Sequence, residues 1–253
     1  MKDTHGLTYD LRLIESGHRK WSNSCALRQV YGACFSAMEQ QAAKGPALEL
    51  GSGIGAMKRV VPDLVTSDII QTPYVDIVAS AYDLDALQRR WATVYAFDVL
   101  HHLREPFTFF ASAARVLKPG GRIVILEPAA TLSGRWFYKM FHHEPMRIHQ
   151  LHAPYVFPSD DESGAFANMG LGWVLFVRDR AMVESKLADM GLQLMTVRFR
   201  DGLAYAATGG FSAPQLLPTW LIRFLLKIEK CLPQSCWQYL GLRMMIVLEK
   251  KNE

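Results

Sequence analysis

Short apolar runs recur along the chain and predict the strands of a β-sheet. Each run consists mostly of Val, Ile, Leu, Ala or aromatic residues, and Gly, Pro, Asp or Ser residues flank most of the runs. The predicted strands are residues 47–50, 65–69, 75–79, 91–97, 122–127, 192–199 and 241–249. The run 122–127 is almost continuously apolar at its centre, as expected for a strand that helices cover on both faces.

Between these runs, apolar residues return at helical spacing. Ser24 is suited to be the N-cap of a helix that Gly45 and Pro46 end, and Asp179 is suited to begin a later one. The predicted helical segments are residues 24–43, 57–61, 85–90, 106–117, 179–190 and 216–231. Residues 8–19 show no clear period and predict a loosely structured arm.

The alternation of strands and helices predicts an α/β fold with a doubly wound parallel sheet. The link 71–73 is too short for a helical crossover between its two strands, so we expect an extended loop there. A chain of 253 residues suits one large domain, 1–253. Its expected parts are an N-terminal arm and helix, 1–44, and two insertions, 129–177 and 203–240.

The sequence Leu-Gly-Ser-Gly-Ile-Gly that ends the first predicted strand is the first candidate site. Gly51, Gly53 and Gly55 allow positive φ angles and close approach of a ligand to the backbone, and the N–H groups that start the next helix attract negative charge. The spacing also fits the Gly-x-Gly-x-x-Ala dinucleotide fingerprint. The motif alone therefore leaves three alternatives: another nucleotide-like cofactor, a nicotinamide dinucleotide, or a turn without a ligand.

Asp68 lies at the end of the second predicted strand, where an acid can meet a ribose. In nucleotide-binding βαβ units, a carboxylate at this place accepts hydrogen bonds from two vicinal hydroxyls. The alternative is an aspartate that caps a helix or forms an Asx-turn.

Composition narrows the class of protein. Half of the residues are hydrophobic, and the net charge of +4 is spread without a Lys/Arg block, which argues against a nucleic-acid-binding surface. The four cysteines show no Cys-x-x-Cys spacing, so reduced thiols are expected. The polar N-terminus lacks the apolar core of a secretion signal and no run is long enough to span a bilayer, so we expect a cytoplasmic protein.

A family resemblance rests on motifs in a fixed order. Leu-Glu-Leu-Gly-Ser-Gly-Ile-Gly at 48–55 is followed by Asp68, by Asp-Val-Leu-His-His-Leu at 98–103 and by Arg-Val-Leu-Lys-Pro-Gly-Gly-Arg at 115–122. Across residues 46–128, the chain resembles class I S-adenosylmethionine-dependent methyltransferases of the small-molecule and lipid type, similar to those of quinone biosynthesis. The resemblance implies a seven-stranded Rossmann-like sheet whose last strand is antiparallel, with helical insertions after strands 5 and 6.

The resemblance also implies roles for individual residues. The turn residues with Glu49 are expected at the methionine end of the cofactor, Asp68 at the ribose, and Asp98 and Val99 beside the sulfonium. Ser80 stands where the family has an acid for the adenine amino group; the backbone of Ala81 can still contact the adenine, and Asp83 is a candidate to replace the acid. The expected cofactor-binding residues are Glu49, Gly51, Ser52, Gly53, Gly55, Asp68, Ser80, Ala81, Asp98 and Val99.

The acceptor is expected to bind against the insertions, since they follow the cofactor motifs. His143 and His102 are candidate general bases, because an imidazole titrates near neutral pH, and structural roles are the alternative. No metal site is expected: His142, His143 and His149 lack an obvious carboxylate or thiolate partner set.

The predicted helix 216–231 carries apolar residues on one side and basic residues elsewhere. It is expected to pack over the sheet or at a homodimer interface, or to contact a membrane or a lipid-linked acceptor. The function predicted from the whole sequence is methyl transfer from S-adenosylmethionine to a small-molecule or lipid-like acceptor, at oxygen. The alternatives are an NAD(P)-dependent oxidoreductase and a non-catalytic partner subunit that binds the same cofactor.

Overall fold

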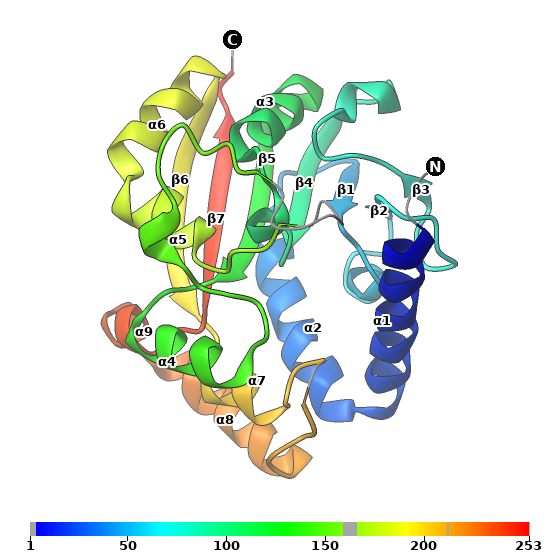
Figure 1. The fold of residues 1–253 in the computed structure, drawn as a ribbon, viewed down its shortest axis with the longest axis vertical. Helices are drawn as coiled ribbons and strands as arrows, with labels where there is room; N and C mark the ends of the chain where they lie inside the picture. Colours follow the sequence, from blue (N-terminus) through cyan, green and yellow to red (C-terminus); the bar gives the residue numbers. More distant parts are fainter. Residues whose placement is uncertain (1–3, 159–165, 212, 253) are drawn as a thin grey trace.

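The computed structural model describes residues 4–158, 166–211 and 213–252. They form a seven-stranded sheet with the order β3-β2-β1-β4-β5-β7-β6 (Figure 1). The strands are β1 (Ala47–Leu50), β2 (Leu64–Asp68), β3 (Ile77–Val78), β4 (Trp91–Phe97), β5 (Leu117–Pro128), β6 (Leu192–Arg200) and β7 (Arg243–Lys250). Residues 1–3 of the predicted arm, 159–165 of the first insertion and 212 of the second lie outside the described residues.

The strand directions confirm the predicted fold class. β1 runs parallel to β2 and β4, and β4 runs parallel to β5. β7 lies between β5 and β6 and is antiparallel to both. The carboxyl ends of β1, β2, β4 and β5 therefore meet at one edge of the sheet, which is where ligands bind in open α/β sheets.

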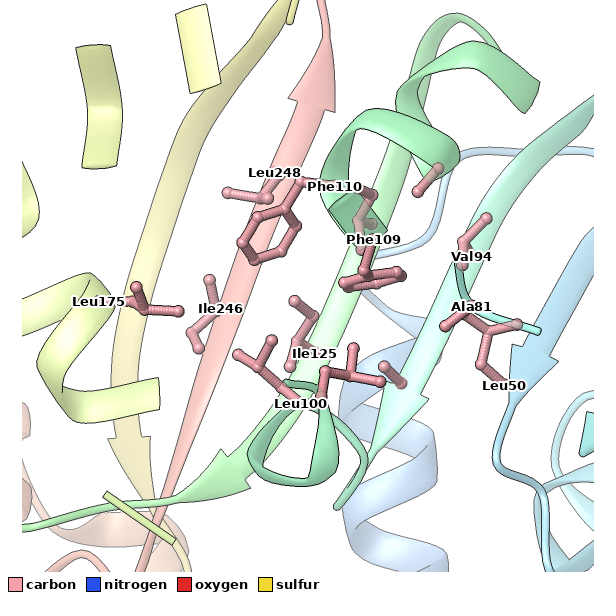
Figure 2. Packing of buried hydrophobic residues seen from close by; sticks show 14 of the residues in the cluster. Leu50, Ala81, Val94, Leu100, Phe109, Phe110, Ile125, Leu175, Ile246 and Leu248 are labelled. Carbon is pink, nitrogen blue, oxygen red and sulfur yellow. The ribbon is translucent and has the colours of Figure 1, made fainter. Parts of the chain in front are cut away.

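The sheet is buried on both faces because its strands send alternate side chains to opposite sides. Leu50, Val94 and Ile125 belong to one hydrophobic cluster with Phe109 and Phe110 of the helix that follows β4 (Figure 2). The neighbouring side chains in the strands belong to a second cluster with α2, α7 and α8. The strand residues of this second cluster include Ala47, Tyr95, Val124, Leu126 and Val247.

Helices cover both faces and the carboxyl edge. The α-helices are α1 (Thr4–Asn23), α2 (Cys25–Glu39), α3 (Pro106–Val116), α4 (Leu132–Phe141), α5 (Leu171–Trp173), α6 (Arg180–Asp189), α7 (Leu203–Ala207), α8 (Thr219–Cys231) and α9 (Gln234–Leu240). Short 3₁₀ turns η1 (Ala56–Arg59), η2 (Leu84–Leu87), η3 (Leu100–His102) and η4 (Ile148–Gln150) and the π-helical turn η5 (Val174–Arg178) complete the set. In Figure 1, α4, α7 and α8 lie beyond the carboxyl ends of β4 and β5.

The N-terminal arm is the largest correction to the sequence prediction. Residues 8–19 are part of α1, a continuous helix of 20 residues. The apolar residues of α1 show no clear period because the helix packs against two different partners. Trp21 belongs to the core around α2, and the His18 ring stacks on Tyr74 with ring centroids 4.6 Å apart. α2 begins after Ser24, whose side chain accepts the Leu27 N–H at 3.1 Å, as predicted, but ends at Glu39 rather than 43.

Other differences concern element ends. Residues 118–121, which separate the predicted helix 106–117 from the predicted strand 122–127, are an irregularity inside β5, where Gly120 has φ +68° and the register with β4 shifts. β3 has only two residues. Asp179 precedes α6, but its carboxylate binds Arg178 and Tyr155 instead of capping backbone N–H groups. The helices α4, α5, α7 and α9 have no counterpart among the predicted helical ranges.

Two predictions from composition can be compared with the structure. Cys25, Cys34, Cys231 and Cys236 are free thiols, as expected. Among the described residues, no helix combines the length and the hydropathy needed to cross a bilayer.

Candidate active site

A cavity of about 750 Å³ opens at the carboxyl edge of the sheet. Glu49 of β1 and Gly51 and Gly53 of the glycine turn line one part of it, and a group of histidines lines another part. Three helices close the cavity from outside. Gly17 of α1, Tyr138 of α4 and Tyr205 of α7 are among the residues that line it. The cavity thus joins the candidate cofactor site to the predicted acceptor insertions.

The glycine turn has the backbone that its sequence predicts. Gly51, Gly53 and Gly55 have φ angles of +60°, +51° and +63°. A Cβ on Gly51 would lie 2.5 Å from Val99 Cγ2, and one on Gly55 would lie 2.5 Å from the Tyr74 carbonyl oxygen, whereas a Cβ on Gly53 would point into open space. Two of the glycines therefore permit close packing behind the turn, and Gly53 presents bare backbone to the ligand.

β2 supports the turn from the side. The Ser52 N–H donates to the Ser67 carbonyl oxygen at 2.9 Å. The Asp68 carboxylate accepts the Gly53 N–H at 3.0 Å and the Ile69 N–H at 2.7 Å. Asp68 thus lies next to the turn, as the resemblance requires, but it braces the backbone and is not among the residues that line the cavity. The ribose contact stays a prediction. In place of the helix expected after the glycine turn, the structure has the single 3₁₀ turn η1. Because η1 is so short, its N-terminus carries only a weak helix dipole.

Glu49 is an unusual carboxyl group in this wall. Only 4 % of the residue is exposed, and within the described part of the chain its Oε2 has no hydrogen-bond partner. Burial raises its pKa to about 8. An unpartnered buried carboxyl group at the edge of a cavity is suited to receive a cation.

The expected adenine residues lie apart from this cavity. Ser80 is exposed and its hydroxyl accepts the Tyr82 N–H at 3.3 Å, while Ala81 is buried and Asp83 is exposed. None of the three lines the cavity, so their contact with adenine also stays a prediction.

Asp98 is held by an arginine that the sequence analysis missed. Asp98 has φ +53°, and its Oδ2 accepts a hydrogen bond from Arg243 Nη2 at 2.8 Å. Arg243 is 2 % exposed, and its guanidinium carbon lies 5.2, 4.6 and 4.4 Å from the ring centroids of Tyr31, Phe97 and Tyr205. The signal in the sequence was an arginine at the start of the apolar final strand.

Glu127 fixes the loop after β4. It is fully buried at the end of β5 and accepts the N–H groups of Val99 and Leu100 at 2.8 and 2.7 Å. Its other oxygen lies 2.7 Å from His101 Nδ1. Val99, a predicted cofactor contact, is therefore placed by a carboxylate that sequence reasoning did not single out, although an acid at the end of an apolar strand is itself a signal.

Glu144 brings the histidines together. Its carboxylate lies 3.4 Å from His101 Nε2 and 3.6 Å from His102 Nε2. His142 and His143 approach it at 3.8 and 3.9 Å. The structure thus joins the Asp-Val-Leu-His-His-Leu loop to the first insertion through an acid that the sequence analysis did not name.

The charges in this group are interdependent. Burial lowers the pKa of His101, but its contacts with Glu127 and Glu144 outweigh that effect and raise it to about 10. For Glu144, burial alone would raise the pKa, but the hydrogen bond from His101 and the charges of the neighbouring histidines outweigh burial and lower the pKa to about 2. Burial and the charge of His101 lower the pKa of His102.

The candidate bases both line the cavity. The side chain of His102 is 45 % exposed and that of His143 is 72 % exposed. His149, the third member of the histidine set weighed as metal ligands, is exposed and does not line it.

The sheet order, the antiparallel β7 and the glycine turn at the carboxyl edge define the class I Rossmann-like methyltransferase fold. Residues 25–174 match the family model described as a methyltransferase domain, and the chain belongs to that family. Its expected cofactor is S-adenosylmethionine, and the oxidoreductase alternative is not favoured. No curated protein matches the chain.

Two solved structures show the likeness in fold. A SAM-dependent methyltransferase from Archaeoglobus fulgidus is 12 % identical, with a TM-score of 0.52, and the match covers 91 % of this chain and 96 % of that one. A SAM-dependent methyltransferase from Thermotoga maritima, described as a possible histamine N-methyltransferase, is 14 % identical, with a TM-score of 0.52 and coverage of 92 % and 94 %.

Proposed function

We propose that this methyltransferase transfers a methyl group to an oxygen of a small-molecule or lipid-like acceptor. The observation that carries the proposal is the shared cavity, in which the glycine turn and a wall of aromatic and histidine side chains line one space. S-adenosylmethionine supplies an electrophilic methyl group when bound, and the chain's own residues align the acceptor with it and exclude water.

The residues of the cofactor side fit this ligand. The unpartnered Oε2 of Glu49 is suited to pair with the ammonium of the methionine moiety, in a wall made of bare backbone at Gly53. Asp68 would hold the ribose, Ser80 and Ala81 the adenine, and Asp98 and Val99 would flank the sulfonium. Gly51, Ser52 and Gly55 keep the turn in shape.

The acceptor side favours an apolar or phenolic compound. The insertion 129–177 contributes Tyr138 and the group around Glu144, and the insertion 203–240 contributes Tyr205 and Phe211. Aromatic faces bind apolar or aromatic groups, and imidazole next to them can accept a hydroxyl proton. This combination supports methylation at oxygen and agrees with the resemblance to quinone-biosynthesis methyltransferases.

His143 and His102 are the proposed candidates for the general base. Both expose a ring nitrogen near the Glu144 carboxylate at the rim of the cavity. With an acceptor in hand, the variants His143→Ala and His102→Ala separate the two roles: loss of turnover at unchanged cofactor affinity identifies a base. Full turnover in both variants would exclude both residues from that role.

The first experiment is isothermal titration calorimetry with S-adenosylhomocysteine, with NADH and NADPH as controls. Micromolar binding of S-adenosylhomocysteine alone is expected and would justify an acceptor screen weighted toward phenolic and lipid-linked compounds. Binding of only a nicotinamide, or of none of these ligands, would overturn the proposal.

The exposed face of α8 supports a peripheral membrane contact in the proposed function. Trp220, Phe224 and Ile228 follow one another at helical spacing and are 68 %, 56 % and 43 % exposed. Only Ile222 of this helix is fully buried in the core. Exposed Lys227 and other basic residues accompany the aromatic face, as in helices that lie at an anionic membrane surface. A homodimer through this face is the competing use.

A further inference from the structure

We infer that His101 Nε2, His102 Nε2 and the Glu144 carboxylate form a binding site for a divalent transition-metal ion of the zinc type. In the described part of the chain, these three residues are the group whose possible ligand atoms all lie within 4.8 Å of one another. All three line the cavity, on the side where the acceptor is proposed to bind. The site rests on geometry alone; its role in methyl transfer rests on the proposed function.

The spacing of the donor atoms suits an ion at their centre. In a tetrahedral site with bonds of about 2.0 to 2.1 Å, neighbouring ligand atoms lie roughly 3.4 Å apart. Glu144 Oε2 lies 3.4 Å from His101 Nε2 and Glu144 Oε1 lies 3.6 Å from His102 Nε2, and one ligand atom from each of the three residues lies within 4.8 Å of the others. A slight rotation of the His102 side chain, which is 45 % exposed, would bring its Nε2 to the spacing that an ion requires.

The second ring nitrogen of each histidine is already engaged. His101 Nδ1 lies 2.7 Å from the buried Glu127 carboxylate, and His102 Nδ1 lies 3.3 Å from the Phe166 carbonyl oxygen. Both partners are acceptors, so the Nδ1 atoms carry the protons and the Nε2 atoms face Glu144. A histidine that binds a metal through one nitrogen and a carboxylate or carbonyl through the other is the usual arrangement in metalloproteins.

The donor set indicates the kind of ion and its use. Two imidazoles and one carboxylate suit Zn²⁺ and related ions, and a set of only three protein ligands leaves a position for an outside oxygen. That oxygen would be the acceptor hydroxyl, which would release its proton to His143, another residue that lines the cavity. Its oxygen then bonds to the methyl carbon, the carbon–sulfur bond breaks, and the electron pair stays on sulfur. In this arrangement His102 is a ligand, which leaves His143 as the candidate base.

Without an ion, the same geometry describes a protonated His101 that bridges Glu127 and Glu144. The two states differ in a property that can be measured directly, the affinity for Zn²⁺. If His101 and Glu144 formed only a structural ion pair, a substitution of His102, which contacts Glu144 from the exposed side, would not change the affinity for Zn²⁺.

The test is calorimetric titration of the chelator-treated full chain with Zn²⁺, followed by the visible spectrum of the Co²⁺ form. We expect one ion per chain and an intense tetrahedral Co²⁺ spectrum. His102→Ala and Glu144→Gln should each lower Zn²⁺ affinity at least tenfold, and Glu127→Gln, which disturbs only the support of His101, should lower it by about tenfold. His149→Ala, an exposed histidine outside the cavity, is the matched control and should bind Zn²⁺ as the parent does.

The result that overturns the site is absence of stoichiometric binding, or binding that persists unchanged in both His102→Ala and Glu144→Gln. Circular dichroism of each variant establishes that it is folded, and His102 is exposed enough for its variant to retain the fold. S-adenosylhomocysteine affinity is measured on the same samples. Metal binding without cofactor binding would refute the proposed function and leave the site standing; the reverse would refute the site alone.

Discussion

The two halves of the cavity are built in different ways. On the cofactor side, one contiguous stretch supplies the wall: β1, the glycine turn and β2 hold each other by backbone hydrogen bonds, and among the described residues Oε2 of the buried Glu49 carboxyl has no hydrogen-bond partner. On the acceptor side, charged side chains from distant segments pair with one another, as in Glu127 with His101 and Glu144 with His102. The cofactor half thus offers a single carboxyl group to a cationic ligand, whereas in the acceptor half several ionisable side chains share their contacts.

The largest effect is expected from removing a charge on the acceptor side. Glu127→Ala leaves two buried backbone N–H groups and His101 without their acceptor, so the free energy of unfolding should fall by about 3 to 5 kcal/mol. Urea denaturation measures the change. Glu184→Ala, which breaks only the exposed pair with Arg180, should change stability by less than about 1 kcal/mol. Equal stability losses in the two variants would contradict a structural difference between Glu127 and a surface acid.

On the cofactor side, Asp68→Ala should weaken binding of S-adenosylhomocysteine by about 1 to 3 kcal/mol, the range for losing hydrogen bonds to a charged group. Calorimetry gives the affinity. The exposed Asp63, five residues earlier in sequence, provides the control Asp63→Ala. If affinity is unchanged in both variants, Asp68 only braces the turn and the ribose assignment is wrong.

The unpartnered carboxyl predicts a pH dependence. Because burial raises the pKa of Glu49 to about 8 in the free protein, Glu49 is protonated below that pH, and a bound ammonium favours its ionised form. Ligand binding then expels a proton, so affinity for S-adenosylhomocysteine should rise by about tenfold, roughly 1.4 kcal/mol, from pH 6 to pH 7. Glu49→Gln should flatten this profile; an unaltered slope in that variant would assign the dependence to another group.

The smallest effect concerns the outer surface. Lys227→Gln should weaken binding to vesicles that contain phosphatidylserine by about 1 kcal/mol and leave binding to neutral vesicles unchanged. Cosedimentation measures the partition. Lys251 follows β7 at the opposite end of the molecule from α8 (Figure 1), so Lys251→Gln is a suitable control. Self-association of the parent protein in sedimentation runs, together with no vesicle binding, would favour the homodimer instead.

The sequence predicted the parts of the structure that local chemistry determines. The strands and the conformation of the glycine turn follow from short apolar runs and from residues that permit positive φ, such as Gly51 and Gly55. The order and direction of the final strands came from the family resemblance. The support of the turn by Asp68 lies within one βαβ unit, so adjacent sequence could place it.

The acceptor side could not be predicted in the same way. Glu144 meets His101 only after the first insertion folds back over the edge of the sheet, and no local pattern encodes that distance. The helix α1 was missed because its side chains serve two partners, so its apolar positions do not form one stripe. Contacts between site residues that lie far apart in sequence could therefore be found only from the structure.

The pair between Asp98 and Arg243 sets the order in which a newly made chain can complete this cavity. Asp98 is available once β4 has formed, but its half-buried carboxylate gains its countercharge only when Arg243 of β7 arrives. Until the ribosome has released that strand, the loop after β4 carries an uncompensated charge and the central sheet lacks the neighbour of β5. Ligand binding should therefore require synthesis of the chain through β7, since a nascent chain that holds every cofactor motif would still lack Arg243, which lines their cavity.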